Sequence, residues 1–187
     1  MNRRLLLASI ATLSATRAMA QSMHPLAPAP STSTDAQQKH IKETLAIGSL
    51  SLLLSRIALP RVTQPMLKQF AQFEIAEQET VADVLKAIQT NAKPKGTIQA
   101  PTDAELMQNL DAAAKGSVAK LRAEHPGSQF DVDYIRYEVE GHHKLLDVQE
   151  VYLKAPDNLD QTNFAKLART MIKEHLALLA NMHKAGG

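Results

Sequence analysis

The sequence predicts an all-α protein, and its composition and apolar spacing carry that prediction. Aromatic residues make up only 4% of the 187 residues and tryptophan is absent, whereas β-strands are normally rich in aromatic and β-branched residues. Hydrophobic residues make up 44% of the chain, which is enough to build a packed core. Apolar side chains recur at helical spacing in four long segments and, less clearly, in a fifth, and no segment shows the alternation of a strand.

The helical segments have recognisable boundaries. Helices are expected at residues 35–59, 65–91, 130–154 and 160–184, with a weaker one at 102–124. Asp35 is the expected N-cap of the first segment, which Pro60 ends, and Pro65 suits the first turn of the second. Thr102 and Glu105 have the spacing of a capping box at the start of the weaker segment.

The lengths of the connections predict how these helices are arranged. About five residues join the first long helix to the second and the third to the fourth, so each pair is expected to form an antiparallel hairpin. About forty residues, which include the weaker helix, separate the second long helix from the third. One long crossover between two hairpins is the connectivity of ferritin-like bundles. The sequence therefore predicts a ferritin-like four-helix bundle over residues 35–185.

The start of the chain has the features of an export signal. Arg3 and Arg4 precede a short apolar run at 5–15, and small residues before the expected cleavage site after Ala20 match what a signal peptidase recognises. The paired arginines also fit the twin-arginine export route. Residues 21–34 are rich in Pro, Ser and Thr and are expected to form a flexible leader. These features predict an exported, periplasmic protein.

Charge and cysteine content exclude several classes of function. Three of the 21 Lys and Arg residues and none of the 19 Asp and Glu residues lie in segment 1–20, so the cleaved chain has 18 basic and 19 acidic residues and no basic surplus for nucleic acid. No later segment is apolar for long enough to span a membrane. The absence of cysteine excludes disulfides, thiolate metal sites, thiol catalysis and a lipidated anchor.

The sequence supplies no pattern for catalysis. There is no Gly-x-Ser-x-Gly motif and no Gly-rich phosphate loop, so we predict no catalytic residues and do not expect an enzyme. Glu140 and His143 have the Glu-x-x-His spacing of di-iron proteins, but helical geometry turns both away from the predicted core. His24, His40, His125 and His183 are expected to be solvated, because they lie in the leader, in loops or near helix ends.

Three titratable residues fall in the middle of predicted core stripes. On the second long helix the expected stripe contains Met66, Phe70, Phe73, Val81, Val84 and Ile88. Glu77 lies at its centre, while His142 and His175 lie within the stripes of the third and fourth helices, with Glu138 one turn before His142. Folding the second hairpin brings the two histidines to within about 5 Å in height, so we expect a polar layer across the bundle.

Two interpretations of this layer remain open. In the first, Glu77 bridges the histidines in a neutralised hydrogen-bond network that fixes helix register. In the second, Glu77, His142, His175 and also Glu138 are candidate ligands of one transition metal ion, with iron, manganese and zinc all chemically suitable.

The first long helix is apolar on two opposite sides. Leu50, Leu54 and Ile57 form one stripe, and Ile41, Leu45, Leu52 and Leu59 form the other. Because both sides must be covered, either the crossover helix packs on the second side or a partner does. The partner expected in the latter case is a second copy of the chain or another protein of the envelope.

Several short motifs resemble the domain-of-unknown-function family 4142. They are Phe70-Ala71-Gln72, Phe130-Asp131-x-x-Tyr134 leading to His142, and Lys173-Glu174-His175-Leu176. The resemblance spans about residues 36–183 and implies an exported, ferritin-like bundle of unestablished molecular function. Members usually carry an acidic residue followed by His on the second helix and Asp-His on the third, where this chain has Glu77-Gln78 and Gly141-His142.

Two hypotheses about function follow. The first is a non-catalytic structural or interaction protein of the bacterial envelope. The alternative is a metal-binding bundle for storage, sensing or redox chemistry.

Overall fold

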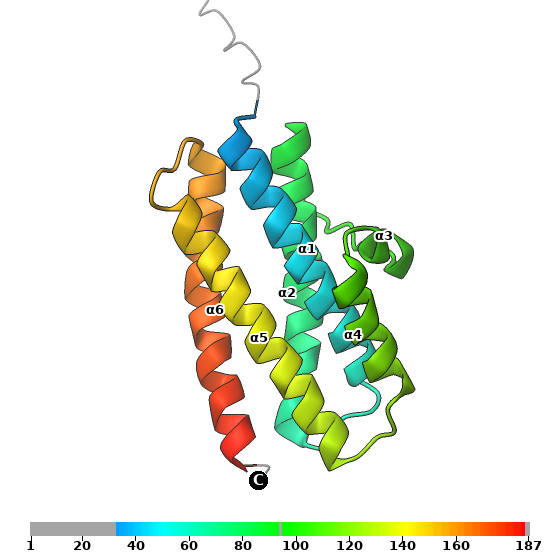
Figure 1. The fold of residues 1–187 in the computed structure, drawn as a ribbon. Coiled ribbons are helices and arrows are strands. Elements are labelled where there is room, and N and C mark those ends of the chain that lie inside the picture. The colour runs from blue at the N-terminus through cyan, green and yellow to red at the C-terminus, as the bar shows by residue number, and fades with distance from the viewer. Residues whose placement is uncertain (1–32, 94, 186–187) are drawn as a thin grey trace, which may run out of the picture. The chain divides into compact units, whose positions relative to one another are not determined.

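The computed structural model describes residues 33–93 and 95–185, and within them it contains six helices and no strand. The helices are α1 (Asp35–Ala58), α2 (Pro65–Thr90), α3 (Asp103–Gln108), α4 (Ala112–Ala123), α5 (Ser128–Tyr152) and α6 (Leu159–Ala185) (Figure 1). The all-α prediction is confirmed. The predicted signal peptide and most of the predicted leader lie outside the described residues.

The helix ends follow from local hydrogen bonding. Thr34, rather than the expected Asp35, is the N-cap of α1, because its hydroxyl accepts from the backbone N–H of Gln37 while the Gln37 side chain accepts from the backbone N–H of Thr34. α2 begins at Pro65, as expected. It ends where Asn91 adopts a left-handed conformation with φ 48°.

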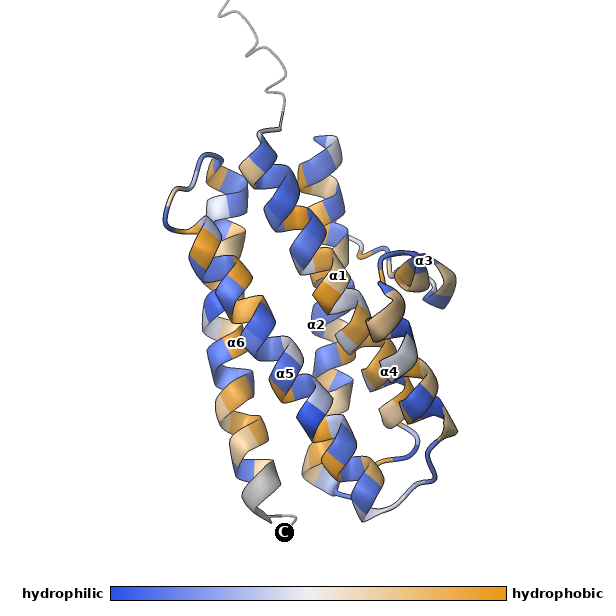
Figure 2. Cartoon of the chain, viewed as in Figure 1, coloured by the Kyte–Doolittle hydropathy of each residue, from blue (hydrophilic) through white to orange (hydrophobic). Residues whose placement is uncertain are grey.

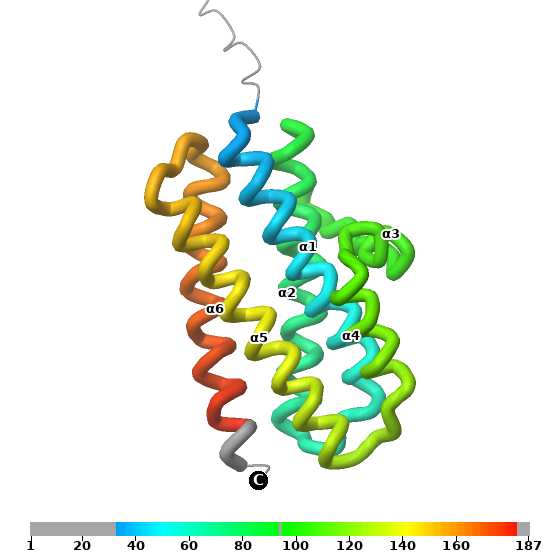
Figure 3. The backbone as a smooth tube through the Cα atoms, viewed as in Figure 1, coloured from blue at the N-terminus to red at the C-terminus, as the bar shows by residue number. Residues whose placement is uncertain are grey.

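The four long helices lie side by side. α1 packs against α2 and α5, and α6 packs against α5 and α2 (Figure 1). Figure 3 shows that α1 and α6 run in one direction and α2 and α5 in the other, so that each packed pair is antiparallel. The connection from α2 to α5 carries α3 and α4, which lie against α1.

The crossover holds two helices where the sequence analysis expects one. Asp111 interrupts the predicted helix, because its carboxylate accepts a hydrogen bond from the backbone N–H of Ala114 at 2.8 Å and caps a new helix. The capping box of Thr102 and Glu105 at the start of α3 is confirmed. The physical reason for the break is that an aspartate favours the N-cap over a helix interior.

Apolar side chains of the crossover cover part of the second side of α1. Leu106, Leu110, Val118 and Leu121 are buried in the same cluster as Leu52. Every large apolar side chain of α1 is buried or half-buried. The crossover covers this side around Leu52 and Leu59, whereas Ile41 and Leu45 pack against apolar residues of α2 and α6. A partner or second copy bound through α1 stays a prediction.

Each long helix carries both hydrophobic and hydrophilic residues (Figure 2). Figure 2 shows hydrophobic and hydrophilic residues alternating along each of them. In the described part of the chain, no helix combines the length and the apolarity needed to cross a membrane.

Candidate metal centre

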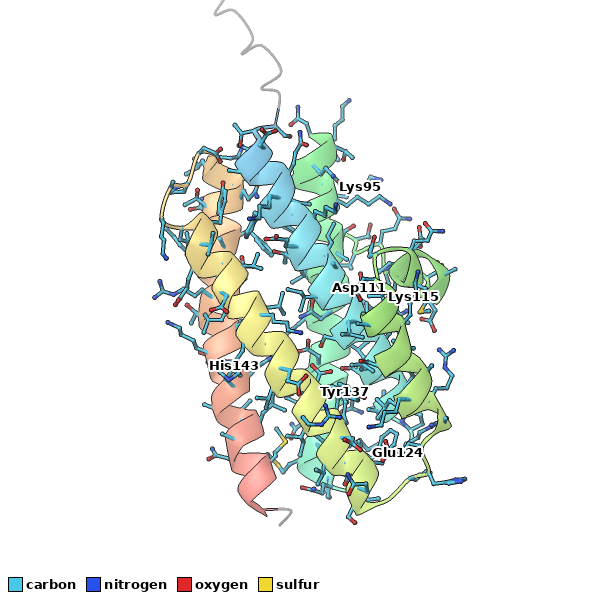
Figure 4. The ribbon with its side chains drawn as sticks, viewed as in Figure 1. Lys95, Asp111, Lys115, Glu124, Tyr137 and His143 are labelled. Atoms are coloured by element: carbon cyan, nitrogen blue, oxygen red, sulfur yellow. The ribbon has the colours of Figure 1, made fainter. Side chains whose placement is uncertain are left out.

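Two predicted site residues meet between α5 and α6. Nε2 of His142 lies 3.0 Å from Nδ1 of His175, and both side chains are buried. The hairpin formed by α5 and α6 brings them to the same height, as the sequence analysis expects. Their neighbour His143, by contrast, is exposed on α5, as its helical position predicts (Figure 4).

A third buried group, Glu74 of α2, completes a cluster that the sequence analysis did not find. Its Oε2 lies 3.1 Å from Nδ1 of His175 and 3.5 Å from Nε2 of His142, and its side chain is 0% exposed. We call Glu74, His142 and His175 the buried cluster. Its three ligand atoms come from three different helices.

The buried side of α2 explains why Glu74 was missed. Besides Phe70, the buried residues of α2 follow one another in alternating steps of four and three: Leu67, Ala71, Glu74, Gln78, Val81 and Leu85. That coiled-coil-like spacing was the available signal. Three large apolar side chains, Met66, Phe73 and Val84, are exposed instead of buried, which corrects the predicted stripe. Counting them as core placed Glu77 at the centre of the stripe in place of Glu74.

Glu77 lies on the outer side of the buried cluster. Its side chain is 30% exposed, and its Oε2 lies 3.0 Å from Nε2 of His175, the ring nitrogen that faces away from Glu74. Glu77 therefore contacts a candidate ligand without reaching the point where the three ligand atoms converge.

Glu138 also lies beside the cluster without joining its centre. Its carboxylate is 3.6 Å from Nδ1 of His142, and the hydroxyl of Ser51 lies 2.6 Å both from Oε2 of Glu138 and from Oε1 of Glu74. One hydroxyl hydrogen can serve only one of these two carboxylates. Glu138 must therefore be protonated and donate to Ser51 when Ser51 donates to Glu74.

The side chain of Gln78 holds the second oxygen of Glu74. Its amide donates to Oε1 of Glu74 at 2.9 Å, and it occupies the position where the family resemblance leads one to expect a histidine. Gly48 makes room for it, because a Cβ atom at Gly48 would lie 2.5 Å from Oε1 of Gln78. Glu74 is thus oriented by both Ser51 and Gln78.

The burial of these groups shifts their protonation. Burial alone would raise the pKa of Glu74, but the two adjacent histidines outweigh it and hold that pKa well below its usual value. Burial would lower the pKa of His175, yet Glu74 and Glu77 outweigh burial and raise it to about 10. Burial, together with the nearby Glu74 carboxylate, raises the pKa of Glu138 to about 8.

Contacts on the outer sides of the two histidine rings determine which ring nitrogen carries a hydrogen and which directs a lone pair to the centre. Nδ1 of His142 lies 2.7 Å from the backbone carbonyl oxygen of Glu138, which can only accept. Nδ1 therefore carries a hydrogen, and Nε2 of the neutral ring presents a lone pair to the centre. Once His175 gives up its second proton, the carboxylate of Glu77 beside Nε2 keeps the remaining hydrogen on that atom, and Nδ1 then presents a lone pair to the centre.

The three atoms that converge in the buried cluster, Oε2 of Glu74, Nε2 of His142 and Nδ1 of His175, need a positive charge between them. Oε2 of Glu74 is buried and has no aligned hydrogen bond within the described residues. In that part of the chain, no Lys or Arg pairs with Glu74, Glu77 or Glu138, whose ion-pairing partners are the two histidines. Only a proton or a metal cation can supply the charge.

The spacing of the three atoms fits a transition metal ion. Their separations are 3.0, 3.1 and 3.5 Å. The corners of such a triangle lie about 1.9 Å from its centre, which is close to the usual zinc–nitrogen and zinc–oxygen bond length of about 2.0–2.1 Å. The residues present therefore fit a metal ion.

A second buried polar layer, around His40, differs from the buried cluster in its protonation and its hydrogen bonds. The prediction that His40 is solvated is wrong, because this residue is 3% exposed and its ring stacks on Tyr152 at 4.4 Å between ring centroids. Its Nε2 lies 2.8 Å from Oε1 of Gln149, and the amide of Gln161 lies 2.7 Å from its Nδ1. Burial lowers the pKa of His40, so this layer is neutral and both ring nitrogens have partners.

Replacing Glu138 by Gln tests its protonation in the metal-free protein. A folded pKa of about 8 against 4.5 for the exposed group means that the fold binds more protons than the unfolded chain, so this contribution to stability is lost as pH rises between those values. In Glu138→Gln, the neutral amide can still donate to the hydroxyl of Ser51, and it has no titratable proton to lose as the pH rises. Urea unfolding is expected to show similar stability of the two proteins at about pH 5 and a wild type less stable than the variant by at least about 1 kcal/mol at about pH 9. A constant difference across this range would contradict a protonated Glu138.

Comparison with known sequence families shows which family the chain belongs to. The sequence profile of a domain of unknown function, DUF4142, matches residues 21–182. The chain belongs to the DUF4142 family. The resemblance inferred from the motifs is thereby confirmed. All three residues of the buried cluster lie within the DUF4142 match, but the family description assigns them no role.

A solved structure shares the fold of this DUF4142 protein. The crystal structure of a DUF305 fragment from Deinococcus radiodurans aligns with a TM-score of 0.64 and 17% sequence identity, covering 81% of this chain and 97% of that chain. At this identity the likeness concerns the fold alone. None of the curated proteins matches the sequence significantly.

Proposed function

We propose that this DUF4142 protein binds one transition metal ion through Glu74, His142 and His175. The observation that carries the proposal is the convergence of a buried carboxylate oxygen without an aligned hydrogen bond and two ring nitrogens, at separations that suit a metal ion. The neutral, fully paired ring of His40 is what a purely structural histidine looks like in this fold, and the buried cluster differs from it.

The donor set favours a divalent ion of intermediate hardness. Two imidazoles and one carboxylate suit zinc, ferrous iron and manganese, and three protein ligands leave a coordination position for water or a small ligand. In this proposal, Glu77 and the Glu138 carbonyl orient the two rings from outside. The Glu138 side chain acts through Ser51 on Glu74, instead of binding the ion itself.

The surrounding fold is proposed to be a ferritin-like four-helix bundle that is exported to the periplasm. Two antiparallel hairpins, a long crossover between them and the parallel course of α2 and α5 support that description (Figure 3). The basic and apolar start of the sequence supports export.

A structural or interaction role in the envelope is the competing proposal. It is favoured by the 3.0 Å separation of the two ring nitrogens, since a single proton shared between them would also supply positive charge. In that case the cluster fixes helix register and takes up no metal.

Two adjacent histidines of α5 give a matched test. Titration of the metal-free wild type with zinc(II), followed by calorimetry, is expected to show one ion bound per chain. His143→Gln, which changes an exposed ring, should bind as the wild type does. His142→Gln should lose at least about 100-fold in affinity, because loss of a partner outside the ligands already costs about 10–100-fold. A wild type that binds no zinc, or equal losses in both variants, would contradict the proposal.

A further inference from the structure

We propose that Glu77 captures the incoming metal ion at the protein surface and transfers it to the buried cluster. The inference rests on the proposed metal-binding function and assigns the route of uptake, between α2 and α6. Glu77 is then an outer ligand that the ion meets first and leaves behind.

Solvent exposure of the side chains increases from the buried cluster outward to Glu77. Glu74 and His142 are essentially inaccessible, the side chain of His175 is 9% exposed, and that of Glu77 is 30% exposed. On the side of Glu74 that faces α1 and α5, the buried side chains of Ser51 and Glu138 cover the cluster, and the buried ring of Phe70 packs against both histidine rings. A hydrated ion therefore has its shortest approach past Glu77.

The ring of His175 connects the outer and inner groups. Its Nε2 lies 3.0 Å from Oε2 of Glu77, and its Nδ1 lies 3.1 Å from Oε2 of Glu74. Carboxylate, imidazole and carboxylate thus form one continuous row from the surface to the centre. Glu77 is thus separated from the convergent ligand atoms by one imidazole ring, so an ion held at its carboxylate lies next to the buried cluster.

The Glu77 carboxylate is available for a cation. Its inner oxygen is buried without an aligned hydrogen bond, and within the described residues its ion-pairing partner is His175 instead of a Lys or Arg. Phe73, one turn earlier on α2, is 53% exposed, and Leu178, about one turn after His175 on α6, is 43% exposed. Solvent therefore reaches both flanks of the Glu77 and His175 pair.

The rates of metal loading and release test this role. Cobalt(II) is mixed rapidly with metal-free wild type, with Glu77→Gln and with Glu174→Gln, which removes an exposed carboxylate next to His175. For Glu77→Gln, we expect loading and release to slow together by about 10-fold, since a capture group lowers the barrier in both directions. The Gln amide oxygen can still accept from Nε2 of His175 and keep the ring oriented, so the dissociation constant should change by less than the roughly 10-fold that loss of a ring partner costs. Glu174→Gln should change either rate by less than about 2-fold. Glu77→Asp, which keeps the charge, should load faster than Glu77→Gln.

The alternative outcomes separate this inference from the proposed function. If Glu77→Gln loads at the wild-type rate but releases cobalt faster, Glu77 only orients His175 and the capture role is wrong. If Glu77→Gln and Glu174→Gln slow loading equally, general surface charge accounts for the effect and the capture role is also wrong. If the wild type itself takes up no cobalt, the metal-binding function fails, and the proposed route fails with it.

Discussion

Glu74→Gln is expected to abolish tight metal binding and to destabilise the metal-free fold by about 3 kcal/mol near neutral pH, because it removes the fully buried counter-charge that contacts both histidines. Glu74 is fully buried and has two ring nitrogens within 3.5 Å. Urea unfolding of the wild type and the variant, with and without zinc(II), measures both effects. The wild type should gain about 4 kcal/mol at a zinc concentration 1,000 times the dissociation constant, and Glu74→Gln at that concentration should gain almost nothing.

The control for this experiment is Glu140→Gln. Glu140 is a surface carboxylate on α5 that pairs with Arg136 at 3.3 Å. Its replacement should change the free energy of unfolding by less than about 1 kcal/mol and leave the zinc effect intact. If Glu74→Gln keeps the zinc-induced stabilisation, Glu74 is not a ligand. If zinc stabilises neither protein, the cluster is a hydrogen-bond network closed by a proton.

Asp131→Ala is expected to cost about 2–3 kcal/mol of folding free energy, although Asp131 takes no part in the proposed metal site. Its fully buried carboxylate, at the start of α5, accepts from the hydroxyl of Thr63 at 2.6 Å and from the backbone N–H groups of Thr63 and Gln64. These donors lie in the connection between α1 and α2, so Asp131 fixes both this turn and the start of α2. Charged hydrogen bonds of this kind are worth about 1.5–3 kcal/mol each, with only part of that lost when water replaces them.

Thermal or urea unfolding of Asp131→Ala and Asp147→Ala measures this contribution. Asp147 is exposed on the same helix, and its replacement should change stability by less than about 0.5 kcal/mol. Similar stability for the two variants would show that the carboxylate of Asp131 does not hold the turn.

The long helices could be predicted because their boundaries depend on local chemistry. Pro65 starts α2 and Thr102 with Glu105 starts α3, and each of these signals acts within one turn of its own helix. The break between α3 and α4 was not predicted, because the signal that marks it is a single side chain. The apolar spacing continues through it, and only the side chain of Asp111, which prefers the N-cap, marks the interruption.

The candidate site could be predicted only in part. His142 and His175 were found because the short loop between α5 and α6 fixes their relative height. Glu74 was missed because its orientation depends on how α2 turns toward its neighbours, and exposed apolar residues such as Phe73 biased that choice. His40 was misjudged because its hydrogen-bond partners Gln149 and Gln161 lie more than a hundred residues away in the sequence.

A crystal structure of the protein grown with cobalt(II) or zinc(II), with anomalous diffraction recorded at the absorption edge of the metal, tests the central claim most directly. We predict one strong anomalous peak per chain, about 2.0–2.2 Å from Oε2 of Glu74, Nε2 of His142 and Nδ1 of His175. No peak within the buried cluster at millimolar metal, with Glu74 hydrogen-bonded to a protonated histidine instead, would contradict it.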